Sequence, residues 1–439
     1  MNVLNQGASV HISRRNLLTG LAGAASAAAI DRLGAQVTEA TMLEQSLVRH
    51  QGSGTELPRK EDFDIAEGYT YINGAFTHPM PIAAGNAFRA AVDRRSKLAP
   101  PTPRPPGTPA PPRRPDARAA FATLINAKPS EIAYVQNTST GENLAIESLG
   151  LNRPFDGNIV TDELHFEGAL VHLLELKKRG ADVRIVKQKD GRIDMADMTR
   201  VVDRKTKLVE VSFVSMYNGF QHDLKAVCDL AHANGAYVYA DIIQGVGAVP
   251  LDVRATGLDF AASATYKWLM GDFGLAFFYV REELLGTVVE RPHWSYESAP
   301  DTEFHLSPFD PEYPKPVTYT PGKEAQHFFQ LGTTASAIAS ALAVSIPYIH
   351  GLGVENIQQH RIPLLRRLQA ELPRLGFTPQ TPADSTSPVL TFAMKDTTEV
   401  GRKLNAARVS VRVAPHWVRI APSVYNDMRD VERLLEALA

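Results

Sequence analysis

The sequence predicts an α/β fold in which helices cover both faces of a mostly parallel sheet. Two observations lead to this prediction. Short apolar runs alternate with helical stretches from about residue 116 onward, and these runs are almost continuously apolar, as in strands that are buried on both faces. In addition, 439 residues with 44% hydrophobic content can bury a large core and a second, smaller one.

The elements of the larger core follow one another in strand and helix order. The expected strands are IAYVQN, NIVTD, VRIV, KLVEVSFV, AYVYAD, FAASAT and LAFFYV. The expected helices between them are DARAAFATLINA, a helix from Gly141, VHLLELKKRG, MADMTRVVD and DLKAVCDLAHANG. These elements define a large domain, residues 60–325.

The pattern changes after about Gly322. Long helical segments are expected at residues 331–348 and 355–372, and short strands at 389–392 and 409–413. We interpret residues 326–439 as a smaller C-terminal α/β domain.

Two segments lie outside this pattern. Residues 99–115, APPTPRPPGTPAPPRRP, contain too many prolines for a helix or a central strand and predict an extended loop, either a linker or a cover for a site. Residues 1–35 resemble a bacterial twin-arginine export signal, because Arg14 and Arg15 precede a short apolar run and the first acidic residue is Asp31. We therefore expect a periplasmic or otherwise exported protein without a membrane span in its mature form; a transit peptide or a plain tail on a cytoplasmic protein is the alternative.

Composition narrows the possible partners. The formal net charge of -2, without a long run of one sign, gives no reason to expect a nucleic acid, and a small molecule is the better expectation. The single cysteine, Cys228, excludes an internal disulfide framework. Neither an HExxH pair nor a Cys/His cluster is present, so no metal site is predicted.

Lys267 is the first candidate for chemistry. It stands in FAASATYKWLMGDFGLAFFYV, just beyond an apolar strand and before a turn that contains glycine. Partial burial there would lower the pKa of the ammonium group and supply the neutral amine that forms an imine with an aldehyde. A lysine that extends to solvent at a strand end is the alternative for a lone lysine.

Asp241 and Gln244 favour the chemical interpretation of Lys267. Asp241 ends the run AYVYAD, 26 residues before the lysine, and ligands of open α/β sheets bind at the carboxyl ends of the strands. An aspartate there can pair with the protonated pyridine nitrogen of pyridoxal 5'-phosphate (PLP) and keep the ring an electron sink. Gln244 can donate to the phenolic oxygen. A helix cap or a metal-ligating acid would explain Asp241 alone, but neither would explain Lys267.

A third segment could hold a phosphate. Ser139, Thr140 and Gly141 follow a strand and open a helix, where hydroxyl groups and backbone donors can bind an anion. An ordinary helix cap is the alternative.

From Tyr71 to the C-terminus, a series of short motifs occurs in a characteristic order: YINGA, TSTGEN, DELHFEGA, DIIQ, ATYKW, the GTT of residues 332–334, and VRIAPSVYND. The chain thereby resembles the class V aminotransferase family of fold-type I PLP enzymes, which includes cysteine desulfurases, kynureninases and isopenicillin N epimerases. Overall similarity favours the isopenicillin N epimerase-like branch.

For the cofactor, this resemblance implies that Lys267 is the imine lysine, that Asp241 and Gln244 contact the ring nitrogen and the phenolic oxygen, and that Ser139, Thr140 and Gly141 form the phosphate cup. It also implies that Phe166 stacks on the ring and that Tyr266 reaches the phosphate. Ordinary core packing is the alternative for these two aromatic residues.

The resemblance has further implications for the substrate and for assembly. Arg419 matches the arginine that grips a substrate α-carboxylate, and Asn73 matches a residue that hydrogen-bonds on the substrate side. Thr333 matches a residue that a second subunit contributes to the phosphate site, which implies a homodimer with shared active sites. The alternatives are a surface ion pair for Arg419, a turn for Asn73 and a helix cap for Thr333.

The sequence departs from its relatives at two points, Cys228 and Met216. Cys228 lies within a helical pattern, which disfavours an enzyme-bound persulfide but not a lyase that releases sulfur directly. Met216 stands where many relatives place an asparagine, and Asn218 and Tyr217 are the candidates to compensate. His165, beside Phe166, is a minor candidate for proton transfer, and a structural histidine is the favoured interpretation.

The leading hypothesis is a PLP enzyme for an amino acid or a similar, possibly peptide-linked, substrate. The substrate displaces Lys267 from the cofactor, Arg419 holds its carboxylate, and the freed lysine moves the α-proton. Epimerisation, transamination and elimination all remain open. The alternative is a non-catalytic binding or regulatory protein that keeps the fold as a scaffold.

Overall fold

The computed structural model describes residues 56–98, 117–300 and 319–439, which belong to one compact unit that begins at Thr55. The predicted export signal, residues 1–35, and the Pro-rich segment, residues 99–115, lie outside the described residues.

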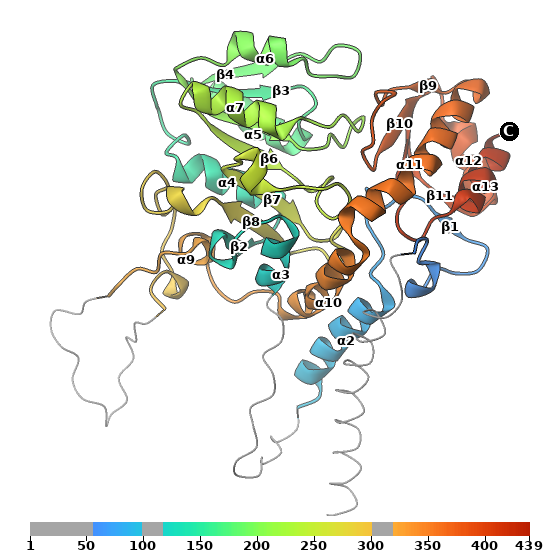
Figure 1. Ribbon diagram of the computed structural model, residues 1–439, viewed down its shortest axis with the longest axis horizontal. Coiled ribbons are helices and arrows are strands. Elements are labelled where there is room, and N and C mark those ends of the chain that lie inside the picture. The colour runs from blue at the N-terminus through green and yellow to red at the C-terminus, as the bar shows by residue number, and fades with distance from the viewer. Residues whose placement is uncertain (1–55, 99–116, 301–318) are drawn as a thin grey trace, which may run out of the picture. The chain divides into compact units, whose positions relative to one another are not determined.

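A seven-stranded sheet forms the centre of this unit (Figure 1), with the strand order β2-β8-β7-β6-β5-β3-β4. β8 (Ala276–Val280) is antiparallel to both of its neighbours, whereas every other neighbouring pair is parallel. The predicted mostly parallel sheet is therefore confirmed. The remaining strands are β2 (Ile132–Val135), β3 (Asn158–Asp162), β4 (Asp182–Val186), β5 (Thr206–Ser212), β6 (Tyr237–Asp241) and β7 (Phe260–Ala264).

Helices cover both faces of this sheet. Neighbouring residues of a strand point to opposite faces, so that each face presents apolar side chains to a layer of helices. In β6, Val238 and Ala240 belong to one apolar cluster and Tyr239 to another. The first cluster includes residues of α3 (Ala117–Leu124), α6 (Met195–Val201), α7 (Leu224–Ala233) and α8 (Val253–Thr256). The second includes residues of α4 (Thr138–Ser148), α5 (Glu167–Lys178) and α9 (Ala325–Phe329).

A second, antiparallel sheet has the order β12-β13-β10-β9. Its strands are β9 (Thr378–Pro379), β10 (Leu390–Ala393), β12 (Arg412–Ala414) and β13 (Trp417–Ile420). A third apolar cluster joins it to α11 (Val354–Glu371), α12 (Thr398–Ala406) and α13 (Met428–Leu438). The strand expected at 409–413 is thus divided, because β11 (Val409–Ser410) leaves this sheet and pairs with β1 (Thr70–Tyr71).

α10 (Ser336–Leu352) begins five residues later than the helix expected from residue 331. Its apolar side chains, among them Ile338, Leu342 and Ile346, belong to the cluster of the large sheet. The helix packs against α2 (Ile82–Ser96) and α3, and Figure 1 shows α2 beside it. By packing, α10 therefore belongs with the large sheet although it follows residue 325.

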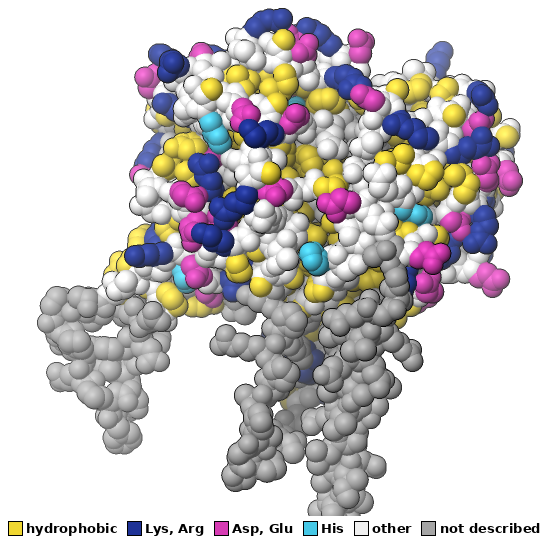
Figure 2. Space-filling view, viewed as in Figure 1, with side chains coloured by type: hydrophobic (Ala, Val, Ile, Leu, Met, Phe, Trp, Pro, Cys, Tyr) yellow, Lys and Arg dark blue, Asp and Glu magenta, His cyan; other side chains and the backbone are white. Residues whose placement is uncertain are grey.

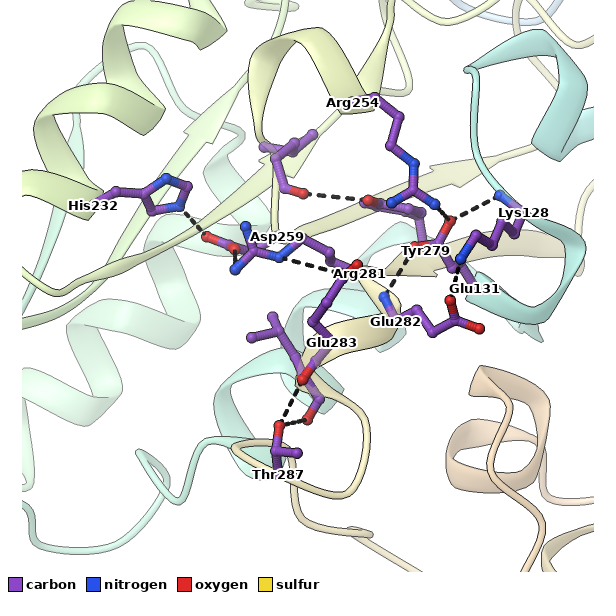
Figure 3. A network of polar contacts seen from close by, with 12 residues as sticks. Lys128, Glu131, His232, Arg254, Asp259, Tyr279, Arg281, Glu282, Glu283 and Thr287 are labelled. Atoms are coloured by element: carbon purple, nitrogen blue, oxygen red, sulfur yellow. Dashed lines mark hydrogen bonds and ion pairs between the residues drawn. The ribbon is translucent and has the colours of Figure 1, made fainter.

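The amino edge of the large sheet is held by buried ion pairs (Figure 3). Because β8 runs in reverse, Arg281 after β8 meets Asp259 before β7, with 2.8 Å between Nη2 and Oδ1. Glu131, directly before β2, pairs with Arg254 of α8. Both carboxylates are fully buried, so removing either arginine would leave a buried carboxylate without its arginine partner. These pairs tie together the strand ends at this edge.

Short 3-10 helices complete the described unit: η1 (Lys60–Asp62), η2 (Pro129–Glu131), η3 (Glu282–Leu284), η4 (Tyr296–Ser298) and η5 (Leu372–Leu375). No single helix in the described ranges is long and apolar enough to cross a membrane; the bent pair of α10 with α11 and η5 passes by length and composition. On the face shown in Figure 2, the coloured basic and acidic side chains are interspersed.

Candidate active site

A cavity of about 460 Å³ opens at the carboxyl edge of the large sheet. β2, β3, β5, β6 and β7 all point toward this edge, which is where open α/β sheets bind ligands. The cavity is lined by seven of the predicted site residues: Ser139, Phe166, Asp241, Gln244, Tyr266, Lys267 and Arg419. The fold therefore brings together side chains that lie up to 280 residues apart in the sequence.

Lys267 follows β7 and is only 8% exposed. Burial lowers the pKa of its ammonium group, and Arg419 lowers it further, while the carboxylate of Asp241 acts in the opposite direction. The lysine begins a tight turn in which its carbonyl accepts from the Met270 N–H at 2.8 Å. The amine is therefore held inside the cavity in an environment that favours its neutral, nucleophilic form.

Asp241 ends β6, and burial raises the pKa of its carboxyl group, an effect that the charge of Lys267 opposes. Its Oδ1 accepts from the Ile243 N–H at 3.0 Å. Oδ2 makes no hydrogen bond with the described residues. One carboxylate oxygen is thus fixed by the backbone, and the other can accept from a protonated ring nitrogen.

Gln244 is oriented by the residue after the lysine. The indole N–H of Trp268 donates to Gln244 Oε1 at 3.1 Å. Because an indole nitrogen can only donate, this bond identifies the oxygen of the amide. Gln244 Nε2 donates one hydrogen to the Ala75 carbonyl at 3.1 Å. Its second hydrogen can serve a phenolic oxygen in the cavity, as predicted.

The start of α4 separates the three predicted phosphate-binding residues. Ser139 lines the cavity. Thr140 donates its N–H and its hydroxyl to Asn137 Oδ1, at 2.9 and 3.1 Å, and lines a neighbouring cavity instead. Gly141 touches the sheet, since a Cβ there would lie 2.6 Å from Ala262 Cβ. The N–H groups of Thr138 and Ser139 have no acceptor among the described residues, and a phosphate at this helix end would fit them.

Aromatic side chains form two walls of the cavity. Phe166 precedes α5, and its N–H donates to Ser212 Oγ at 3.2 Å. Tyr266 stacks on Phe273, with 4.3 Å between ring centroids. His165 is buried and does not line the cavity. Its Nδ1 lies 2.9 Å from Ser212 Oγ, and burial lowers its pKa. His165 therefore supports the wall next to Phe166 without lining the cavity.

Arg419 lies on β13 and is 3% exposed. Its Nη1 donates to the Met216 carbonyl at 3.1 Å, whereas its Nε has no hydrogen-bond partner among the described residues. Burial, and after it the nearby Arg412, lower its pKa to about 10. Asn218 does not compensate for Met216 in the cavity, because its amide bonds to the backbone of Gly191 and Phe220.

Besides Thr140 and Gly141, two further predicted residues lie outside the main cavity. Asn73 lines a separate depression, and its backbone bridges to Ala421. Thr333 lines a cavity of about 660 Å³ together with Thr140, and its hydroxyl lies 3.3 Å from that of Tyr296.

Five charged or aromatic residues of the main cavity were not predicted: Phe76, Glu167, Phe273, Arg412 and Trp417. Arg412 and Trp417 belong to a hairpin whose two-residue turn, Pro415 and His416, is visible in the sequence. Pairing the two short strands across that turn would have placed Arg412 opposite Arg419. Glu167 carries no signal beyond its position next to Phe166.

The reversed β8, the buried lysine after β7 and the aspartate at the end of β6 define a PLP-dependent enzyme of fold type I. The family model described as aminotransferase class V matches residues 113–434. The chain belongs to this family, and the predicted family, fold and cofactor are confirmed.

Proteins similar to this chain include desulfurases and a lyase. A probable cysteine desulfurase from Methanothermobacter thermautotrophicus is 29% identical over 258 residues, 58% of this chain and 60% of that protein. An apo cysteine desulfurase structure from Thermococcus onnurineus NA1 has a TM-score of 0.75 at 22% identity, covering 88% of this chain and 98% of that one. The cystine C-S lyase C-DES, in complex with its product cysteine persulfide, has a TM-score of 0.71 at 18% identity, covering 85% and 97%.

The side chains of the cavity fit PLP. Lys267 offers an amine, Asp241 a free oxygen, Gln244 a second amide hydrogen, and the start of α4 two backbone donors. When bound, the cofactor supplies an electron sink for a carbanion at the substrate Cα. No group of three metal-ligating side chains occurs among the described residues.

Proposed function

We propose that this enzyme removes the α-proton of an amino acid and then expels a group from the side chain, as a lyase that uses no thiol of its own. The observation that carries the proposal is the presence of Lys267 and Arg419 in one cavity. The first can accept a proton and the second can hold a carboxylate.

Each of these residues has a defined task in this reaction. Arg419 binds the substrate carboxylate through its guanidinium, including the unpartnered Nε. Lys267 would hold PLP through its amine, and the bound cofactor would supply the electron sink for the substrate Cα. Because burial lowers the pKa of Lys267 to about 8, a larger fraction of its free amine is neutral than in an exposed lysine, and this neutral amine accepts the proton from Cα. Asp241 would hold a proton on the ring nitrogen of PLP, and Gln244 would orient the ring through its phenolic oxygen.

The chain's only cysteine supports release of the leaving group without an enzyme persulfide. Cys228 lies in α7, within the apolar cluster of the large sheet, and is fully buried. Burial raises the pKa of its thiol to about 12. A thiol of this kind is neither ionised nor accessible to substrate sulfur.

Epimerisation is the second candidate. The motif resemblance to isopenicillin N epimerases favours it, and it begins with the same proton transfer by Lys267. A racemase or a transaminase would differ from the lyase only after Cα has lost its proton.

Incubation of the holoenzyme with a panel of amino acids in heavy water tests the proposal. We expect the wild-type enzyme to release ammonia and a ketoacid that lacks the leaving group. The Lys267→Ala variant should not exchange the α-hydrogen of the substrate for deuterium. Deuterium at Cα with the nitrogen retained would instead support epimerisation, and a ketoacid with an intact side chain would support transamination. If no amino donor changed the absorbance spectrum of the bound cofactor, the enzymatic proposals would be contradicted and a non-catalytic binding protein would be favoured.

We further propose that the enzyme acts as a homodimer with shared active sites. Thr333 lies close to the start of α4, since both line one cavity, and the neighbouring Leu331 is 63% exposed. A second subunit could cover this apolar side chain. Sedimentation should show a dimer that Leu331→Asp weakens; a monomeric wild-type enzyme with full activity would contradict the proposal.

Export by the twin-arginine route is also proposed, on the basis of Arg14 and Arg15. A fusion of the full chain to a reporter should reach the periplasm of a bacterial host, and changing both arginines to lysine should retain it in the cytoplasm. Equal export of the two versions would contradict the proposal.

A further inference from the structure

We propose that Arg412 binds a second anionic group of the substrate, so that the preferred substrate is an α-amino acid with an acidic side chain. The inference rests on the proposed function, in which Arg419 holds the α-carboxylate. Three observations support it: the register of the two arginines, the absence of a protein counter-ion and the different depths of the two guanidinium groups.

The register brings the arginines together. β12 and β13 are antiparallel, and Arg412 is the direct partner of Arg419. Directly opposed residues of an antiparallel pair project from the same face of the sheet and lie close enough to interact. Both arginines line the cavity that also contains Lys267. The hairpin therefore presents two guanidinium groups to one ligand space.

Neither arginine has an acidic partner in the described part of the chain. Among the described residues, Asp241 and Glu167 are the only acidic side chains lining the cavity, and no ion pair joins either of them to Arg412 or Arg419. Like charges directly opposite each other destabilise a sheet, and Arg412 lowers the pKa of Arg419. The Nε of the buried Arg419 is also left without a partner. Anionic groups of a ligand would relieve both unfavourable features.

The two guanidinium groups lie at different depths. Arg419 is buried, whereas Arg412 is exposed and lies over the ring of Phe76, with 5.5 Å between Cζ and the ring centroid. Phe76 lines the cavity too and is itself half exposed, so this contact marks the mouth. A ligand whose first anionic group meets Arg419 needs a second one nearer the mouth to meet Arg412. A carboxylate or another anionic group in the side chain of the amino acid meets this requirement.

Unreactive acids test this inference without catalysis. Calorimetry of the holoenzyme would compare succinate with succinamate and glutarate with glutaramate, since each pair differs only in the charge of one end. We expect each diacid to bind at least about 10-fold more tightly than its monoamide, because a hydrogen bond to a charged group contributes about 1.5–3 kcal/mol.

Variants at the mouth assign the preference to a residue. Arg412→Gln should reduce the diacid-to-monoamide ratio to about 1, and Arg412→Lys should restore part of it. Glu167→Gln is the matched control, since it removes an exposed charge that also lines the cavity, and it should keep the wild-type ratio. Cofactor absorbance of each variant establishes that the site is intact.

The outcomes separate this inference from the proposed function. A wild-type enzyme that binds acid and amide equally would mean that both arginines serve one carboxylate. An Arg412→Gln variant that keeps the preference would mean that another residue binds the second anionic group. Either result would make the inference wrong. If the diacid preference is present but no amino acid loses its α-proton in heavy water, the proposed function fails while the anion site stands.

Discussion

Replacing Gly141 with alanine tests how closely α4 must approach the sheet in order to build the phosphate end of the site. The new Cβ would lie 2.6 Å from Ala262 Cβ and 3.2 Å from Phe278 Cδ2. Carbon atoms normally pack at about 3.5–4.0 Å, so α4 has to move away from β7 by roughly 1 Å. Both neighbours are fully buried, so neither can turn aside into solvent.

The displacement has two measurable effects. Overpacking of this kind costs about 1–3 kcal/mol of unfolding free energy, which lowers Tm by several degrees in a domain of this size. The same movement shifts the N–H groups of Thr138 and Ser139 at the start of the helix. Because a misplacement of about 1 Å can cost a site up to 100-fold, we expect Gly141→Ala to weaken PLP binding by about 10-fold or more.

Thermal unfolding of the apoenzyme and titration with PLP measure the two effects separately. Gly351→Ala is the matched control, because Gly351 also lies in a helix and a Cβ there would meet nothing within 4 Å. An alanine at this control position should stabilise the protein by about 0.5–1 kcal/mol without changing PLP affinity. If Gly141→Ala matched the control in both measurements, the argument from close approach would be refuted.

Three further predictions concern Trp268, Cys228 and His78. Trp268→Phe removes the donor that orients Gln244, so the absorbance maximum of the bound cofactor should shift and PLP affinity should fall by about 10-fold; an unchanged spectrum would contradict this role. Cys228→Ala should leave kcat unchanged and lower the free energy of unfolding by about 1 kcal/mol. Loss of turnover in a folded variant would instead indicate that the thiol takes part in catalysis. Burial lowers the pKa of His78 to about 4, so the unfolded state binds its proton first as pH falls below about 6.5. The stability that His78 contributes should therefore decline by about 3 kcal/mol between pH 6.5 and 4, which denaturant titrations of wild type and His78→Gln would reveal as a shrinking difference.

The parts of the site that follow the large sheet could be predicted from the sequence. Asp241 and Lys267 each come directly after an apolar run, and in a parallel sheet such positions share one edge whatever the remaining packing. Their place in the cavity therefore needed only the strand pattern. The roles carried over from the family at Ser139, Phe166, Tyr266 and Arg419 concern residues of the same cavity.

Features that depend on tertiary packing were harder to predict. Whether Thr140 or Ser139 faces the cavity is decided by the cap that Asn137 forms, and several caps fit the same sequence. The apolar pattern of α10 predicts a buried helix without saying that α2 is its partner. Arg412 required the register of a short hairpin, since a shift of one residue would have turned its side chain to the other face.

The burial of Cys228 also has a practical consequence. Because the only cysteine of the chain is buried in the core, the native protein should react very slowly with maleimide dyes. A single cysteine introduced at an exposed position on the cavity wall, such as Phe273→Cys, would then be the principal reactive site for a fluorophore. Ligand binding to the labelled variant could then be measured as a change in fluorescence, without prior removal of native cysteines.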